Sequence, residues 1–232
     1  HLVVDVPRKL QGMAKDGAIV FEGAQGTMLD IDHGTYPFVT SSNTTAGAAS
    51  VGSGVSPLDL GSILGVAKAY STRVGSGPFP TELKDHDGKR MAQEGMEFGA
   101  TTGRPRRCGW FDAVPVRTAG ALSGIDALAL TKIDALDEFE TISIAEAYEL
   151  DGQRVELAPD THALSRARPI YQELPGWMAS TAGLTDYEQL PPNAQLYVQK
   201  VEEVTGIPVA LVGTGQHRNA VVTRNLVFGA KH

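Results

Sequence analysis

The chain has 232 residues, enough to bury a sizeable core as one large domain or two small ones. It carries 27 acidic and 20 basic residues, a formal net charge of -7, which argues against a general nucleic-acid-binding surface but allows a local basic site. The single cysteine, Cys108, excludes an intrachain disulfide and is consistent with a reducing compartment. No apolar run approaches the roughly 20 residues that span a bilayer, and the first residues lack a signal-peptide pattern. We therefore expect a cytoplasmic protein without nucleic-acid or membrane partners.

Early in the chain, an apolar run predicts a buried strand at residues 18–21, after a short helix at residues 7–15. A glycine-rich loop, residues 22–27, follows directly. Open α/β sheets bind their ligands in loops of this kind. Gln25 lies between glycines in this loop, where its amide can read the edge of a ligand. An ordinary turn is the alternative.

The next polar stretch begins with Asp30, Asp32 and His33. Their spacing follows no recognised metal-ligand pattern, so we interpret the two acids as organisers of a turn. Residues 40–45 are six hydroxyl or amide side chains in a row, beginning with Thr40. Such a run can satisfy phosphate oxygens through side chains and backbone amides. A capped loop is equally compatible with these residue types.

A helix is predicted over residues 56–67, because Ser56 can cap it and Pro57 suits its first position. Its buried stripe would consist of Leu60, Ile63, Leu64 and Ala67. An extended stretch at residues 69–74 and a short helix at residues 91–98 are expected to follow.

The central stretch, residues 99–107, changes abruptly from small to basic side chains. Its glycines allow a ligand to approach the backbone, and its threonines supply hydroxyl donors. Three arginines within four positions offer planar forks suited to carboxylate or phosphate, and Pro105 restricts the chain between two of them. The side chains in question are Thr101, Thr102, Arg104, Arg106 and Arg107. An anion site and a solvated basic loop are both compatible with these residue types.

Two further buried strands are predicted, at residues 127–130 and 209–212. The first ends in Thr-Lys-Ile-Asp, where Asp134 can accept hydrogen bonds from guanine N1 and N2 while the stem of Lys132 lies along the ring. Solvated charges at a strand end are the alternative. The second strand leads into Gly-Thr-Gly at residues 213–215. Strands that each end in such a loop predict a largely parallel α/β sheet with one ligand-binding rim.

The remaining elements follow from apolar spacing and turn residues. Helices are predicted at residues 111–122 and 191–206, and a hairpin with an Asp-Gly turn at residues 142–157. Residues 159–175 are expected to be polar and irregular. Tyr171 and Trp177 are interpreted as packing residues.

Several of these stretches together resemble adenylosuccinate synthetase. The matching segments are FEGAQGTMLDIDHGTYPFVTSSNTTAG, AYSTRVGSGPFPTEL, EFGATTGRPRRCGWFD, LTKID, YQELPGW and the closing GTG. They follow the family's order over nearly the whole chain, but cover only what looks like the C-terminal half of that enzyme. The resemblance implies a P-loop-NTPase-like α/β architecture with a mostly parallel sheet, flanking helices and a small antiparallel hairpin. Residues 1–232 would form the C-terminal portion of a single such domain.

The family joins IMP to L-aspartate at the expense of GTP: GTP phosphorylates the purine 6-oxygen, and the aspartate amine displaces that phosphate. The resemblance implies that Gln25 would hydrogen-bond the purine and support the catalytic Asp, and that Thr40 would hold the IMP 5′-phosphate. Arg104 would touch both IMP and aspartate, and Arg106 would also touch the nucleotide. The implied aspartate site comprises Ala100, Thr101, Thr102, Gly103, Arg104, Pro105 and Arg106. The implied GTP site comprises Arg106, Lys132, Ile133, Asp134, Gly213, Thr214 and Gly215.

The chain also departs from the family pattern. The glycine-rich phosphate loop, with its catalytic Asp and Lys, and the following His are absent from the sequence, whose only Gly-Lys pair is followed by Arg90. Pro105 and Gly213 stand where the family often has a basic residue and Ser. The resemblance implies GTP as co-substrate, Mg²⁺ held by the N-terminal half, and a homodimer or an association with that half. A non-catalytic guanine-nucleotide or purine-binding module and an inactive truncated fragment are the alternatives.

Overall fold

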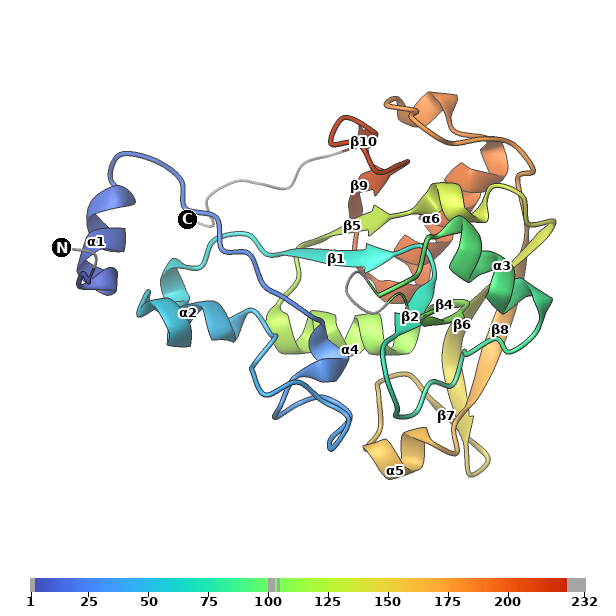
Figure 1. Cartoon of the computed structure of the whole chain (residues 1–232), viewed down its shortest axis with the longest axis horizontal. Coiled ribbons are helices and arrows are strands. Elements are labelled where there is room, and N and C mark those ends of the chain that lie inside the picture. Colours follow the sequence, from blue (N-terminus) through green and yellow to red (C-terminus); the bar gives the residue numbers. More distant parts are fainter. Residues whose placement is uncertain (1–2, 100–102, 104, 225–232) are drawn as a thin grey trace.

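The computed structural model describes residues 3–99, 103 and 105–224. Its central sheet has the strand order β1-β5-β9-β10 (Figure 1). The strands are β1 (Leu64–Lys68), β5 (Ala127–Thr131), β9 (Val209–Gly213) and β10 (Val221–Thr223). β5 pairs in parallel with β1 and β9, whereas β10 runs antiparallel to β9. The predicted parallel sheet and its strands at residues 127–130 and 209–212 are therefore confirmed.

A second sheet is built around the long strand β6 (Thr141–Leu150), which pairs with three neighbours. These are β4 (Phe111–Asp112) in parallel, and β7 (Gln153–Val155) and β8 (Arg168–Pro175) in antiparallel orientation. The β6–β7 hairpin turns at Asp151 and Gly152, both with positive φ, as predicted. The prediction of an irregular segment at residues 159–175 is wrong. β8 has a proline near each end and alternates only weakly between half-buried and exposed residues, so its sequence lacks the alternating pattern that predicts a strand.

Two short strands, β2 (Ser71–Arg73) and β3 (Arg107–Gly109), form a separate antiparallel pair. The helices are α1 (Val6–Met13), α2 (Gly47–Ser53), α3 (His86–Glu94), α4 (Ala113–Ser123), α5 (Thr161–Leu164) and α6 (Pro192–Thr205). Single 3₁₀ turns are η1 (Thr27–Leu29), η2 (Pro57–Asp59), η3 (Ile133–Leu136) and η4 (Tyr187–Gln189). The predictions for α4 and α6 are confirmed: Asp112 caps α4, and Gly206 ends α6 in the left-handed conformation.

One continuous apolar core joins the two larger sheets. α6 packs against β8 and β9, and α4 packs against β6 and α6. Tyr197 of α6, Leu130 of β5 and Ile144 of β6 are fully or almost fully buried. Each buried side chain of this size stabilises the fold by about 1.5–3 kcal/mol relative to its exposed state. Trp177 is buried against Tyr197, as its interpretation as a packing residue requires.

Two further predicted elements are wrong. Residues 56–67 form only the turn η2, capped by Ser56, before the chain enters β1. Gly65 lies in this strand, and a Cβ there would lie 2.8 Å from a methyl carbon of Ile125. Glycine therefore lets Ile125 pack against the bare backbone. The predicted buried strand at residues 18–21 has no ladder partner among the described residues. Val20 is 88% exposed.

The β1 side of the central sheet is open in the described part of the chain. β1 is the outer strand, paired there only with β5, and its central residue Val66 is 74% exposed. α1 has no buried side chain and lies apart from the sheet, at the left of Figure 1. Its Pro7 approaches Gly54 at the end of α2. Parallel strands are normally covered on both faces and paired on both edges, so this edge stands out as incomplete.

Candidate functional site

The loops that follow β5 and β9 lie side by side. β5 ends at Thr131, and Lys132 then adopts the left-handed conformation with φ 61° before η3 begins. β9 ends at Gly213, where a Cβ would lie 3.3 Å from the Cα of Thr131. β9 also contacts η3 directly. The two stretches expected to read guanine therefore share one edge of the sheet, as the parallel topology predicts.

Asp134, in η3, carries an unsatisfied acceptor. Its Oδ1 is buried and accepts no hydrogen bond from the described residues. Burial raises the pKa of Asp134 above its ordinary value, and Asp137 adds to this rise. A buried acceptor without a donor costs about 1–3 kcal/mol, a cost that a ligand with suitably placed N–H groups would remove. Ile133, the preceding residue of the implied GTP site, is fully buried and packs in the core.

Glu97 brings together residues that the sequence assigns to different parts of the site. Its carboxylate is fully buried. Oε1 accepts hydrogen bonds from Lys68 at 2.7 Å, from the Tyr70 hydroxyl at 2.7 Å and from Lys132 at 2.9 Å. Oε2 accepts from Arg106 at 2.9 Å. Burial alone would raise the pKa of Glu97, but these hydrogen bonds lower it to about 2, so the group is a carboxylate at neutral pH.

Sequence reasoning did not single out Glu97 or Lys68. Glu97 is an isolated acid just before the glycine-rich central stretch, and Lys68 is the last residue of a strand that was expected to be helical. Glu97 opens the matching segment EFGATTGRPRRCGWFD but was given no role there, and Lys68 lies in none of the matching segments. Only the tertiary contact between β1, the loop after β5 and the chain before β3 shows that they belong to the site.

The arginine-rich stretch is only partly described. Ala100, Thr101, Thr102 and Arg104 lie outside the described residues, so their predicted roles stay predictions. Gly103 has φ 62°, which glycine adopts without strain. Pro105 forms an isolated bridge with Phe98, and the N–H of Arg106 donates to the carbonyl of Glu97 at 2.7 Å.

Arg107 is neither a free anion-binding fork nor a solvated loop residue, the two interpretations that the sequence left open. Its Nε and Nη2 donate to the two carboxylate oxygens of Glu82 at 2.8 and 2.7 Å. Its Nη1 donates to the carbonyls of Gly75 and Gly77. This bidentate pair uses the planar fork of Arg107 within the protein, where it fixes the loop after β2.

Thr214 is likewise occupied by the protein. It is fully buried, its hydroxyl donates to the carbonyl of Leu184 at 2.8 Å, and its N–H donates to the carbonyl of Ala220. Its contact with a nucleotide remains a prediction, but the hydroxyl is engaged elsewhere. Gly215 lies close to Ala220: a Cβ added to Gly215 would lie 3.2 Å from the Cβ of Ala220.

The loop that carries Gln25 and the run that begins at Thr40 are joined by the Thr44 hydroxyl, which donates to the carbonyl of Gly26 at 2.8 Å, and the turn between them is organised by Asp30. Its buried carboxylate accepts hydrogen bonds from the backbone of Asp32, His33, Thr44 and Thr45 and from the side chain of Asn43. Burial would raise the pKa of Asp30, but these donors lower it to about 2. Asp30 is thus the turn organiser that the sequence predicted. The N–H of Thr40 donates to the carbonyl of Leu29, whereas Gln25 is exposed with φ 62°.

Arg73 links this loop to the arginine-rich stretch. Its Nη2 donates to the hydroxyl of Thr35 at 2.7 Å and to the carbonyl of Phe38 at 3.1 Å. Arg73 lies on β2, which pairs with β3, the strand that follows Arg106. The predicted IMP loops and the Glu97 cluster are therefore joined by one short chain of contacts.

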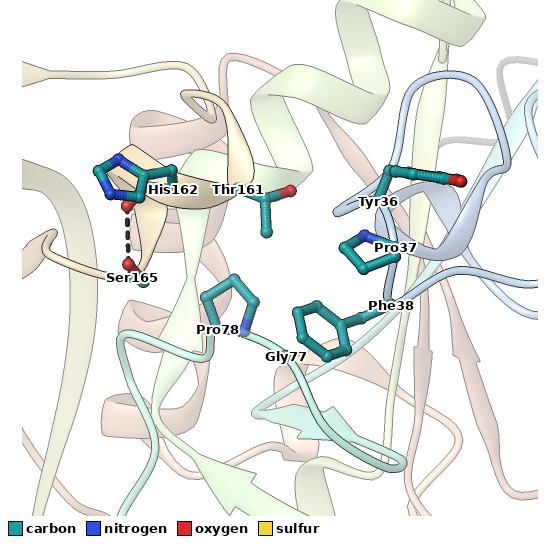
Figure 2. Close-up of a pocket in the computed structure, with 8 residues that line it drawn as sticks. All are labelled: Tyr36, Pro37, Phe38, Gly77, Pro78, Thr161, His162 and Ser165. Carbon is teal, nitrogen blue, oxygen red and sulfur yellow. Dashed lines mark hydrogen bonds between the residues drawn. The ribbon is translucent and has the colours of Figure 1, made fainter.

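A surface hollow of about 610 Å³ lies near the loop that Arg73 contacts. Figure 2 shows Tyr36, Pro37 and Phe38 on one side of the hollow, and Thr161 and His162 of α5 with the following Ser165 on the other. The hydroxyl of Ser165 donates to the carbonyl of His162 at 2.7 Å. The hollow is mostly apolar and includes none of the predicted site residues. Among the residues that the structure describes, no group of three or more His, Cys, Asp or Glu is placed to hold a metal ion, and no helix is long and apolar enough to cross a membrane.

Parallel strands whose adjacent loops carry a buried unsatisfied carboxylate and a glycine backbone define an α/β protein with a candidate ligand site at the edge of its sheet. Residues 1–222 match the family described as adenylosuccinate synthetase. The chain belongs to this family.

Similar proteins show how much of the family's length is present. The chain is 54% identical to the adenylosuccinate synthetase of Nitrosococcus oceani over 231 residues, which are 99% of this chain and 54% of that protein. It is 53% identical to that of Thioalkalivibrio sulfidiphilus over 223 residues, 95% of this chain and 52% of that protein. A structure of fully ligated adenylosuccinate synthetase from Plasmodium falciparum matches with a TM-score of 0.93 and 34% identity, over 96% of this chain and 54% of that one. This confirms the predicted fold class. The chain spans about half the length of the curated relatives it matches.

Proposed function

We propose that the chain takes part, in the cytoplasm, in the GTP-dependent ligation of IMP and L-aspartate to adenylosuccinate, by supplying the loops that bind IMP, aspartate and guanine. The observation that carries this proposal is the buried, unsatisfied Oδ1 of Asp134, in a turn that contacts β9. Guanine presents two adjacent donors, N1–H and N2–H, which a carboxylate can accept together, whereas adenine lacks this pair. Membership of the family supports the same function.

In the proposed reaction, the catalytic Asp of the N-terminal half would take the N1 proton of IMP while the γ-phosphoryl group of GTP passes to the 6-oxygen, and GDP is left. The nitrogen of the aspartate amine then bonds to C6 while the C6–O bond to the phosphate breaks, and the nitrogen releases its proton. Gln25 would hydrogen-bond the purine, and Thr40 would bind its 5′-phosphate. Arg104 and Arg106, with the threonines before them, would hold the carboxylates of aspartate.

The acid and base groups of this reaction would come from an N-terminal half that carries the phosphate loop. Mg²⁺, held by that half, would neutralise charge on the transferring phosphoryl group when bound. The exposed edge of β1 supports completion by further polypeptide, because Val66 and the unpaired edge would be covered by it. The partner would be this N-terminal half, alone or within a homodimer.

The test is a spectrophotometric assay of adenylosuccinate formation from IMP, GTP, aspartate and Mg²⁺. The chain is assayed alone and after mixing with the N-terminal half of a relative such as the Nitrosococcus oceani enzyme. We expect turnover only in the mixture. A folded complex of the two halves without turnover would contradict the proposal. Asp134→Asn serves as a matched variant, because it leaves the phosphate loop untouched and removes the proposed base reader.

A second candidate function is a guanine-nucleotide-binding module without catalysis. It is favoured by the fact that the loops after β5 and β9 are both built within this chain and need no outside residue to lie side by side. This function predicts that GDP binds to the chain alone, that Asp134→Asn weakens binding, and that no mixture turns over. Turnover on complementation would exclude it, and an inactive fragment would neither bind nor turn over.

A further inference from the structure

We propose that Glu97 is a positioning residue for guanine-nucleotide binding, which holds Lys132 and Arg106 on one buried carboxylate so that the base-reading loop and the arginine-rich stretch are fixed relative to each other. This inference rests on the proposed function. It adds Glu97 to that function as a residue that contacts no substrate in the proposed reaction. Lys132 follows β5, whereas Arg106 precedes β3. Glu97 is their shared partner, at 2.9 Å from each.

Glu97 is itself well anchored. Its N–H donates to the carbonyl of Ala92 at the end of α3, and its carbonyl accepts from the N–H of Arg106, both at 2.7 Å. The carboxylate oxygens accept from four side-chain donors, one of them the neutral hydroxyl of Tyr70. A buried carboxylate with its lone pairs satisfied in this way has little freedom to rotate. The geometry of Glu97 therefore dictates where the two cations lie.

The surrounding charges show why the carboxylate is needed. Lys68, Lys132 and Arg106 are three cations around one fully buried anion, and their own side chains are 25, 36 and 34% exposed. The other two cations lower the pKa of Lys68, in addition to the larger effect of its burial. Without the negative charge of Glu97 these groups would repel one another and move apart. The cluster would then lose the arrangement that links Lys132 with Arg106.

A positioning role and a simple charge effect predict opposite signs. Glu97→Gln adds one positive charge to the cluster, so electrostatics alone would strengthen the binding of an anionic nucleotide. Loss of positioning would weaken it, because the amide of Gln turns a donor toward either Arg106 or the lysines. Glu97→Asp keeps the charge but is shorter by one methylene, so it cannot reach all its donors at once. Any loss of affinity in that variant reports geometry.

The experiment is calorimetric titration of the chain with GDP, for the wild type, Glu97→Gln, Glu97→Asp and the control Glu82→Gln. The control makes the same chemical change at a carboxylate paired with Arg107, outside the cluster. Circular dichroism and thermal unfolding check that each variant is folded. We expect both Glu97 variants to weaken GDP binding about tenfold or more, the loss typical of one charge-assisted hydrogen bond. The control is expected to stay within about twofold, since the partners that Glu82 loses, Arg107 and Lys84, lie outside the cluster.

Each outcome decides between named possibilities. Equal or tighter GDP binding by folded Glu97→Gln would overturn the inference and leave the proposed function in place. If Glu97→Gln does not fold, unchanged affinity in Glu97→Asp overturns it instead. Equal weakening in the Glu82→Gln control would show a general loss of stability and overturn it as well. A wild-type chain that binds no GDP would overturn the guanine-binding function, and the inference with it.

Discussion

The substitution Asp134→Asn is expected to change stability and binding in opposite directions. In the wild type the buried Oδ1 of Asp134 has no donor among the described residues, and burial raises the pKa of the group. A neutral amide of the same shape removes the buried charge. We expect the free energy of unfolding to rise by only about 1 kcal/mol, because the amide has no charge to desolvate but keeps an acceptor without a donor, and because Asp134 is only partly buried as a residue.

Guanine binding by the same variant is expected to fall steeply. The carboxylate of Asp134 would accept from both N1–H and N2–H, whereas Asn offers one acceptor and one donor, so one charge-assisted bond is lost and a donor meets a donor. The expected loss is about 3 kcal/mol, which is about 150-fold in the dissociation constant for GDP. Affinity for ADP, which lacks the donor pair, should not fall.

The assays are urea unfolding and calorimetric titration with GDP and ADP, and Asp87→Asn on the exposed start of α3 is the matched control. The control should leave both quantities unchanged. A variant Asp134→Asn that is less stable than the wild type would show that the carboxylate is satisfied in the free chain. Unchanged GDP affinity with an intact fold would refute the assignment of Asp134 as base reader.

Three further predictions concern the scaffold. Burial raises the pKa of Asp112 to about 7, from an ordinary value of 3.8. The stability that protonated Asp112 contributes is therefore lost as pH rises from about 4 to 7, by at most about 4 kcal/mol. Asp112→Asn should remove this pH dependence in urea unfolding across that range, and a variant with the wild-type pH profile would contradict the prediction. Hydrogen bonds hold the pKa of Asp30 at about 2 against the opposing effect of burial. The stability that ionised Asp30 contributes is therefore full above pH 4 and is lost towards pH 2, by about 2 kcal/mol. Asp30→Asn should flatten the acid unfolding curve between pH 4 and 2, and an unchanged curve would count against the role of Asp30 as turn organiser. A Cβ on Gly176 would lie 1.6 Å from the carbonyl oxygen of Phe139, so Gly176→Ala should lower the free energy of unfolding by about 3 kcal/mol. Gly61→Ala, with open space around it, is the control, and equal urea midpoints for the two variants would refute the packing argument.

The elements that the sequence predicted well contain their own signals. α6 has its apolar stripe and a stop signal in Gly206, and both are independent of the rest of the fold. β5 and β9 are short apolar runs ending in polar or glycine residues, which is typical of strands in a parallel sheet. The Asp-Gly turn after β6 sets the hairpin by its backbone preferences alone.

The elements that failed depend on neighbours that no local pattern encodes. Residues 18–21 have the apolar composition of a buried strand, but no described strand lies beside them, and Val20 faces solvent. β1 was mistaken for a helix because Leu60, Ile63, Leu64 and Ala67 match helical spacing, whereas Gly65 packs under Ile125 in a strand.

The candidate site shows the same limit. The motifs around Asp134 and Gly213 were visible because their residue types carry a chemical meaning, and the structure places their loops together. Glu97 was not singled out, because a lone glutamate gains its role only from its cations, and two of these, Lys68 and Lys132, lie 29 and 35 positions away. Neither interpretation left open for Arg107 anticipated its ion pair, because its partner Glu82 lies 25 positions away.

The uncovered edge of β1 has a practical consequence for producing this protein. A row of unpaired backbone groups beside the exposed Val66 is a template on which any extended segment can add, including a second copy of the chain. Overexpression of the chain by itself should therefore drive much of it into inclusion bodies. Co-expression with the N-terminal half should move it into the lysate supernatant, so that the recovered yield reports association before any substrate is added.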